Sequence, residues 1–264
     1  MIPPGGAAEP EWSPDGRQIA FLGYSPPPRR VYVIDTDGGA PHRVISGHFI
    51  EGAPIWSRDS KWVYFTSNRG GGEALWRAPA AGGSPILVAG NGQEPLESLD
   101  GQFVYYSKPD GSIWKAPAAG GSPILLARNG WAPIVESSDR KFIYYNGPDN
   151  IISKVPVTGG EAAPVLKIGT HAIWTSSVAG IFVLDPDAKG GPAIQRCPFT
   201  HKLSGIVRLP GEPGSYTDVV GGPSVSPDGR WIVYLHRDRP DTVIMLLDNF
   251  RCLGAHVPRS TYSG

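Results

Sequence analysis

A long internal repeat constrains the fold of this chain more than any other feature. The segment Leu75–Leu87, LWRAPAAGGSPIL, returns 38 positions later as Ile113–Leu125, IWKAPAAGGSPIL. Looser copies occupy Ile152–Gly160 and Val31–Gly39. Repeats with a period of about 40 residues are typical of arrays of small supersecondary units that stack on one another. We therefore expect a repeat architecture for nearly the whole chain.

A second marker, a tight turn containing Ser and Asp, precedes each copy of the repeat. The aspartates of these turns are Asp15, Asp59, Asp100, Asp139 and Asp228. The first three steps between them are 44, 41 and 39 residues, and the last step is 89 residues. Since 89 residues is about two periods, one degenerate repeat is expected near residues 171–184.

Each period predicts four short strands, because an apolar run of β-branched and aromatic residues follows every turn. These runs are residues 18–21, 62–65, 103–106, 142–145 and 231–234. A period of about 40 residues with four strands is typical of a β-propeller blade. We predict an all-β fold, a six-bladed β-propeller of four-stranded antiparallel blades over residues 9–252. The last blade is expected to be incomplete if no strand follows residues 245–247.

The two ends of the chain lie outside this predicted propeller. Residues 1–8 are expected to be a linker or a truncated N-terminus, and residues 253–264 a C-terminal tail. The two cysteines, Cys197 and Cys252, either pair or remain two thiols, and neither forms a CxxC metal motif. No apolar run approaches the roughly 18 residues of a membrane span, so we expect a soluble, monomeric protein without membrane insertion.

The Ser-Pro-Asp-Gly turn followed by an Ile-Ala-Phe or Val-Tyr-Tyr strand resembles the TolB-like, WD-repeat-like propeller repeat of bacteria. The resemblance covers roughly residues 8 to 252. The ending Asp248–Arg251 is similar to the close of propellers fused to bacterial winged-helix transcriptional regulators. This resemblance implies a partner-binding or sensory domain, in either the cytoplasm or the periplasm of a bacterium.

The charge balance argues against nucleic acid as a partner. The chain has 24 Lys and Arg and 24 Asp and Glu, so its surface has no net attraction for a polyanion. Arg29 and Arg30 form the only local basic cluster, and their Pro-rich surroundings predict a solvated loop. The expected partners are an unknown protein, a peptide or a small-molecule ligand.

No catalytic motif is present, because G-x-S-x-G, HExxH and P-loop patterns do not occur. We therefore choose candidate binding residues by their position in the predicted blades. The first residues of each innermost strand line the mouth of a propeller's central channel. These candidates are Glu9, Glu51, Glu94, Trp131, His171 and Asp218. Such residues can equally be the polar lining that any water-filled channel needs. Trp131 can stack on a sugar, hold a peptide or cap the core.

Two functions from different classes follow from these candidates. The favoured one is a non-catalytic scaffold for ligand or protein binding, the sensor module of a larger bacterial regulator. The alternative is a metal-dependent hydrolase or lyase, in which Glu9, Glu94 and His171 converge on one divalent cation (Ca, Zn or Mn) in the channel. Glu97 and Glu136 replace the tryptophan of the same repeat position, Trp56, and are interpreted as blade-building variants.

Overall fold

The computed structural model of the protein describes residues 7–23, 27–170, 172–177, 180–197, 204–209, 224–225, 231–237 and 242–248. The chain divides into two compact units. The first comprises residues 1–146 and 154–163, and the second residues 147–153 and 164–264. Within the part of the chain that the structure describes, no helix is long and apolar enough to span a bilayer.

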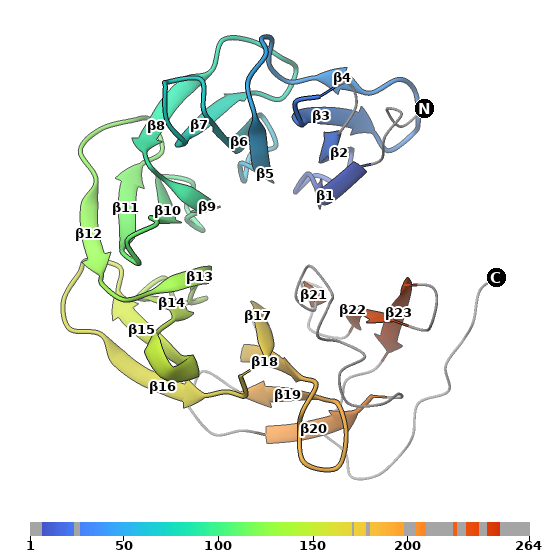
Figure 1. Cartoon of the computed structure of the whole chain (residues 1–264), viewed down its shortest axis with the longest axis vertical. Coiled ribbons are helices and arrows are strands. Elements are labelled where there is room, and N and C mark those ends of the chain that lie inside the picture. The colour runs from blue at the N-terminus through green and yellow to red at the C-terminus, as the bar shows by residue number, and fades with distance from the viewer. Residues whose placement is uncertain are drawn as a thin grey trace. The chain divides into compact units, whose positions relative to one another are not determined.

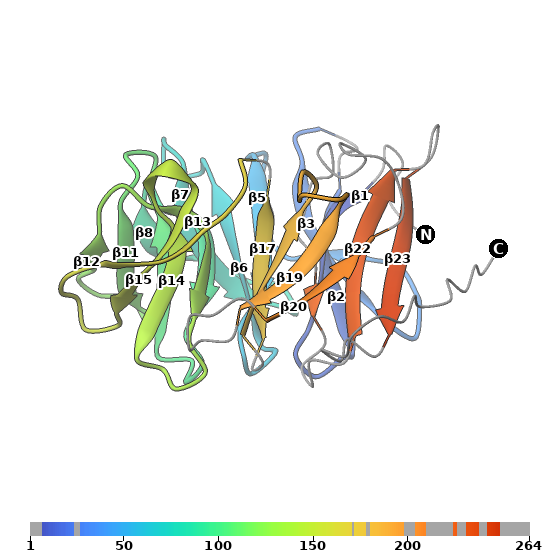
Figure 2. The same ribbon diagram turned by 90° about the horizontal axis from the view of Figure 1, so that it is seen from below.

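The strands follow one another in sequence order within every antiparallel sheet (Figures 1 and 2). The first three sheets are β1 (Ala7–Trp12), β2 (Gln18–Gly23), β3 (Arg30–Asp35) and β4 (His42–Arg43); β5 (Glu51–Trp56), β6 (Trp62–Ser67), β7 (Ala74–Pro79) and β8 (Ile86–Gly90); and β9 (Gln93–Glu97), β10 (Phe103–Ser107), β11 (Ile113–Pro117) and β12 (Ile124–Ala127).

The remaining sheets are β13 (Trp131–Glu136), β14 (Phe142–Asn146), β15 (Ile151–Pro156) and β16 (Ala163–Lys167); β17 (Ile173–Ser177), β18 (Gly180–Asp185), β19 (Ala193–Cys197) and β20 (Ser204–Arg208); and β21 (Ser224–Val225), β22 (Trp231–Arg237) and β23 (Thr242–Asp248). A single 3-10 turn at Pro148–Asn150 interrupts the strands of the described residues.

The predicted count of six four-stranded blades is wrong. Among the described residues, five sheets have four strands, whereas β21, β22 and β23 form a sheet of three. The prediction counted periods and expected four strands in each, but left the last blade open to three. In this last sheet the apolar runs supply only two long strands, β22 and β23, and β21 pairs with β22 over two residues. The all-β propeller class is confirmed, and the number of four-stranded blades is corrected from six to five.

The turn that opens each repeat is held by the same four hydrogen bonds in every copy of the first unit. In the second sheet, Ser57 Oγ donates to Asp59 Oδ1 (2.6 Å) and accepts from the backbone N–H of Trp62 (2.9 Å). The Ser57 N–H donates to the Trp62 carbonyl oxygen, and the Ser60 N–H donates to the Ser57 carbonyl oxygen. Equivalent bonds form at Ser13, Ser98 and Ser137. The turn aspartates therefore have a structural role.

Proline shapes the first strand of each sheet in the first unit. The pairing of β5 with β6 is irregular between Gly52 and Ile55, and that gap contains Pro54. A proline has no N–H to give to a β ladder, so a bulge forms around it. Similar irregularities interrupt β1, β9 and β13 near Pro10, Pro95 and Pro133.

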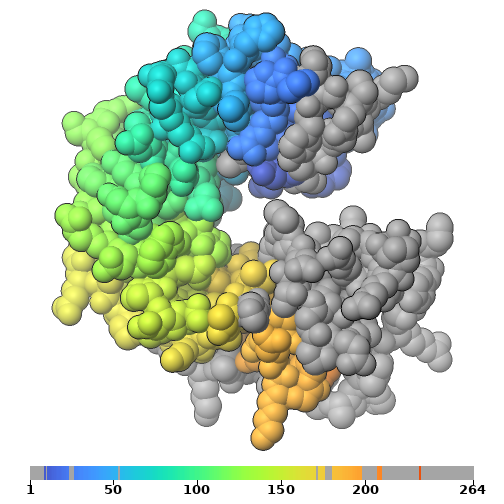
Figure 3. Space-filling model, viewed as in Figure 1, coloured from blue at the N-terminus to red at the C-terminus, as the bar shows by residue number. Residues whose placement is uncertain are grey.

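Neighbouring sheets of the first unit pack face to face, and the largest buried side chains lie at these junctions. Figure 3 shows the coloured residues of this unit in close contact from blue to green. Phe65 and Trp56 lie in one core cluster with residues of β2 and β3. Tyr64 and Tyr106 lie in the next cluster, between the second and third sheets. Burial of aromatic and aliphatic area at these junctions supplies the main driving force for folding.

One repeat position at the junctions is filled in two ways. Trp56 donates its Nε1–H to the carbonyl oxygen of Glu11 in the preceding sheet (2.9 Å). At the same position in the third sheet, Glu97 accepts from the Tyr64 hydroxyl (2.8 Å) and from the backbone N–H of Arg58. Glu136 accepts likewise from the backbone N–H of Leu99 (2.6 Å). Each side chain bonds to the preceding blade, which supports the blade-building interpretation of Glu97 and Glu136.

Candidate functional site

A buried ion pair lies where β5 begins and β6 ends. Glu51 Oε1 accepts from Arg69 Nη2 (2.9 Å), and the two side chains are 0% and 8% exposed. Glu51 Oε2 accepts from the backbone N–H of Val31 in the first sheet (2.9 Å). The Arg69 guanidinium also lies near three aromatic rings, those of Phe49, Phe65 and Trp76. Its position is therefore fixed by packing and by charge.

Three further arginines gather around this ion pair. Arg43 and Arg30 are close enough to act electrostatically on the Glu51 carboxyl. Arg29 contacts the backbone beside Glu51, since a Cβ added to Gly52 would lie 3.2 Å from its Nη2. We call Arg29, Arg30, Arg43 and Arg69 the arginine cluster. These four arginines lie around the Glu51 carboxylate or beside its backbone.

The members of the arginine cluster differ in their access to solvent. Arg29 and Arg43 are exposed, whereas Arg30 is 3% exposed. Arg43 Nη2 donates to the Gly47 carbonyl oxygen (2.9 Å), which ties the arginine to the connection between β4 and β5. Arg30 Nη2 lies 3.2 Å from His48 Nδ1, which accepts when the proton of the ring is on Nε2. Arg29 and Arg43 are thus exposed, whereas Arg30 and the Glu51–Arg69 ion pair are buried.

Replacing Glu51 by glutamine is expected to change how stability depends on pH. Burial raises the pKa of the Glu51 carboxyl above its ordinary value of 4.5, against the opposing effect of the Val31 N–H and the arginines. The folded state thus holds this proton more tightly than the unfolded chain does. The carboxyl's contribution to stability is therefore present in full below pH 4.5 and is lost as the pH rises through the raised pKa.

Urea denaturation of the wild type and of Glu51→Gln, from pH 4.5 toward neutrality, measures this effect. The free energy of unfolding of the wild type, minus that of the variant, should fall as the pH rises. A difference that stays constant over this range would show that the pKa of Glu51 is not raised.

The other predicted channel-mouth residues that the structure describes have surroundings different from those of Glu51. Glu9 and Glu94 are exposed and have backbone φ angles of 50° and 49°, in the left-handed region, each just before a proline. Glu94 Oε2 accepts from the Ser107 hydroxyl (3.0 Å). Trp131 is 49% exposed, and its ring lies against Gly111 of the third sheet. Among the candidates that the structure describes, Glu51 is the one around which the arginine cluster lies.

Some predicted residues fall outside the part of the chain that the structure describes. These are His171, Asp218 and Cys252. Cys197 is buried in β19, and burial raises the pKa of its thiol. Within the described residues, no three His, Cys, Asp or Glu side chains gather in a group that could hold a metal ion. The metal site of Glu9, Glu94 and His171 stays a prediction.

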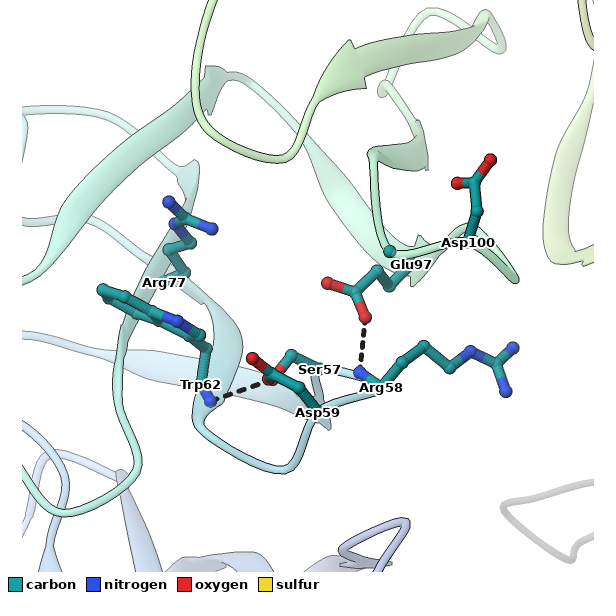
Figure 4. A pocket seen from close by; sticks show the side chains of 8 residues that line it. Ser57, Arg58, Asp59, Trp62, Arg77, Glu97 and Asp100 are labelled. Carbon is teal, nitrogen blue, oxygen red and sulfur yellow. Dashed lines mark hydrogen bonds between the residues drawn. The ribbon is translucent and has the colours of Figure 1, made fainter.

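A pocket of about 270 Å³ lies at the opposite, turn end of the second and third sheets (Figure 4). It is lined by Ser57, Arg58, Asp59, Trp62, Arg77, Glu97, Asp100 and Gly101. At the next junction the position of Gly101 is filled by Arg140, whose Nη1 lies 3.6 Å from Asp100 Oδ2. The glycine therefore leaves space that an arginine occupies one repeat later.

Several polar and charged groups of this pocket already have partners within the protein. Figure 4 shows the Glu97 carboxylate directed at the backbone nitrogen of Arg58, whose guanidinium points away from it. The hydroxyl of Ser98 and the N–H of Gln102 hold the pKa of the Asp100 carboxyl below its ordinary value. Arg77 stacks over the Trp62 ring at 4.5 Å. We assign this pocket to the junction between blades, and the arginine cluster is the better candidate for ligand recognition.

Sequence reasoning named Glu51 as a binding candidate and interpreted Arg29 and Arg30 as a solvated loop, but it missed Arg43 and Arg69. The predicted solvated loop agrees with the exposed Arg29, whereas Arg30 is buried. Arg43 and Arg69 lie in different repeats, and nothing in the local sequence around either residue marks it. One sequence signal could have pointed to Arg43 and Arg69: each lies at or just after the end of a strand, in two successive repeats.

Comparisons with known proteins agree on the fold. The family model described as the TolB beta propeller domain matches residues 3–127. An uncharacterized protein of Agrobacterium fabrum is 34% identical over 73 residues, which are 28% of this chain and 25% of that protein. The matched segments span between 11% and 25% of the lengths of the curated relatives.

Two solved structures illustrate the likeness in three dimensions. TolB from Acinetobacter baumannii superposes with a TM-score of 0.54 and 21% identity, over 92% of this chain and 52% of that chain. An oligogalacturonate lyase in complex with manganese superposes with a TM-score of 0.69 and 13% identity, over 90% of this chain and 72% of that chain. At these identities the likeness establishes the propeller fold alone.

Proposed function

We propose that this chain, whose residues 3–127 match the family model described as the TolB beta propeller domain, is a non-catalytic binding module for a ligand that carries an anionic group. The arginine cluster holds that group at the end of the sheets where β5 begins. In a longer protein, such a module would act as the recognition or sensor part.

One observation carries the proposal, the presence of two exposed arginines, Arg29 and Arg43, beside the buried Glu51–Arg69 ion pair. Arg29 and Arg43 are exposed and offer planar donor arrays that suit carboxylate or phosphate oxygens. The buried ion pair is held in place because Glu51 accepts from the Val31 N–H and the Arg69 Nε–H donates to the Ser67 hydroxyl. Arg29 and Arg43 both lie near Glu51, so their electrostatic attractions for one anionic group add together.

A fluorescence anisotropy titration with a fluorescein-labelled oligoglutamate peptide tests the proposal. We expect Arg29→Ala and Arg43→Ala each to weaken binding by roughly five- to tenfold, the loss of one charge-assisted contact. Binding by the wild type should also weaken as salt is raised, because exposed charges are screened.

Arg58→Ala is the matched control, since Arg58 is an exposed arginine at the turn end of the same sheet. It should leave the affinity for oligoglutamate unchanged. Thermal unfolding of all three variants checks that the fold is retained. Absence of binding by the wild type, or equal affinity of the wild type and the Arg29→Ala/Arg43→Ala double variant, would overturn the proposal.

A further inference from the structure

Two exposed apolar side chains lie beside the arginine cluster. Phe49 and Ile50, in the connection between β4 and β5, are 37% and 48% exposed. The Phe49 ring lies 5.2 Å from the guanidinium carbon of Arg69. Contiguous exposed apolar side chains that are rimmed by polar residues are typical of interaction sites.

The backbone beneath these two residues is held in place before any ligand arrives. The Ile50 N–H donates to Asn68 Oδ1 (3.0 Å), and the Asn68 N–H donates to the Ile50 carbonyl oxygen (3.3 Å). The Phe49 ring packs so closely on Gly47 that a Cβ there would lie 2.8 Å from the ring. Gly47 also has a φ of 111°, which favours glycine. The apolar pair is thus preorganised, which lowers the entropic cost of binding.

The geometry points to a peptide ligand in which an acidic side chain adjoins an aromatic or large aliphatic one. This inference rests on the proposed function and names the partner of the same site. Arg29 and Arg43 would bind the carboxylate, and Phe49 with Ile50 would cover the neighbouring apolar side chain. Arg43 and Phe49 approach each other through Gly47, whose carbonyl oxygen accepts from Arg43 and whose Cα faces the Phe49 ring.

Charge complementarity selects this partner over a purely apolar one. The exposed arginines would repel a basic segment, and an uncharged apolar segment would leave their guanidinium groups without a counter-charge. An acidic segment without apolar side chains would leave Phe49 and Ile50 uncovered. A segment with an acidic and an apolar side chain contacts both the exposed arginines and the Phe49–Ile50 pair. Protein interfaces commonly have this arrangement, in which an apolar contact is surrounded by polar ones.

Two labelled peptides of equal charge test the inference by fluorescence anisotropy. One repeats Gly-Asp-Phe and the other repeats Gly-Asp-Ser. We expect the wild type to bind the Phe-containing peptide about tenfold more tightly, since burying one aromatic side chain is worth about one factor of ten in affinity. Phe49→Ser/Ile50→Ser should remove this preference while leaving the affinity for the Gly-Asp-Ser peptide unchanged. Arg43→Ala should weaken the binding of both peptides.

Ile50→Ser alone provides a second variant, because Phe49 also contacts the buried ion pair and its loss could disturb Arg69. Leu87→Ser, at a 50% exposed position on β8, is the control and should keep the preference. Equal binding of both peptides by the wild type would overturn this inference and leave the proposed function standing. A preference retained in Ile50→Ser and in the double variant would also overturn it. Absence of binding to either peptide would overturn both.

Discussion

Replacing Trp56 by alanine is expected to lower the free energy of unfolding by about 3–5 kcal/mol. The Trp56 side chain is 6% exposed and packs between the first and second sheets with Ala20 and Val33. Its removal leaves a cavity, because the surrounding β-sheet backbones cannot close around a missing indole. It also deprives the Glu11 carbonyl oxygen of its donor.

Urea denaturation monitored by circular dichroism measures this loss in Trp56→Ala. Leu87→Ala is the matched control, since Leu87 is 50% exposed on the outer strand β8, and should change stability by less than about 0.5 kcal/mol. A loss in Trp56→Ala as small as that of the control would mean that the two sheets do not pack through Trp56.

The second large effect is expected at Glu97, which occupies the repeat position of Trp56 in the next blade. Glu97→Leu leaves the buried Tyr64 hydroxyl and the Arg58 N–H without an acceptor, and we expect a loss of about 2–4 kcal/mol. Glu97→Gln keeps an acceptor oxygen and should cost less. The hydrogen bond with Glu97 also affects Tyr64. Burial is the larger cause that raises the pKa of the Tyr64 phenol, and the Glu97 charge is the second.

A double-mutant cycle with Tyr64→Phe separates the contact from the general cost of changing a buried residue. The coupling energy between Glu97 and Tyr64 should be about 1–2 kcal/mol, in the range found for residues in direct contact. Urea denaturation of the two single variants and the double variant gives the four free energies required. Additive losses would show that the hydroxyl and the carboxylate do not stabilise one another.

The two junctions explain why one repeat position accepts both tryptophan and glutamate. Opposite Trp56 the preceding blade has the small pair Ala20 and Val33, which face each other across β2 and β3. Opposite Glu97 the equivalent pair is Tyr64 and Arg77, across β6 and β7. A large apolar ring therefore packs on small partners, and a carboxylate is surrounded by a hydroxyl and a cation. The side chain and its partners change together because they fill one shared space.

Strand positions were predictable from the sequence because their causes are local. The apolar run Trp62–Phe65 follows a Ser-x-Asp turn at the spacing the turn requires, and β6 begins at Trp62 as expected. The predicted site was less complete. Glu51 was found by its position at a strand start, but its partner Arg69 was not, because position along a strand does not reveal which charges meet across a junction.

The sequence by itself determined the all-β class, the blade repeat and the turn chemistry. These depend on interactions between residues a few positions apart, and the repeat presents them several times in the same register. The tertiary structure decided the rest. Only the packing of sheet on sheet gathers Arg43 and Arg69 around Glu51, and only the observed pairing gives five four-stranded sheets among the described residues. Contacts between sheets join residues from different repeats, and no local pattern records which of them will meet.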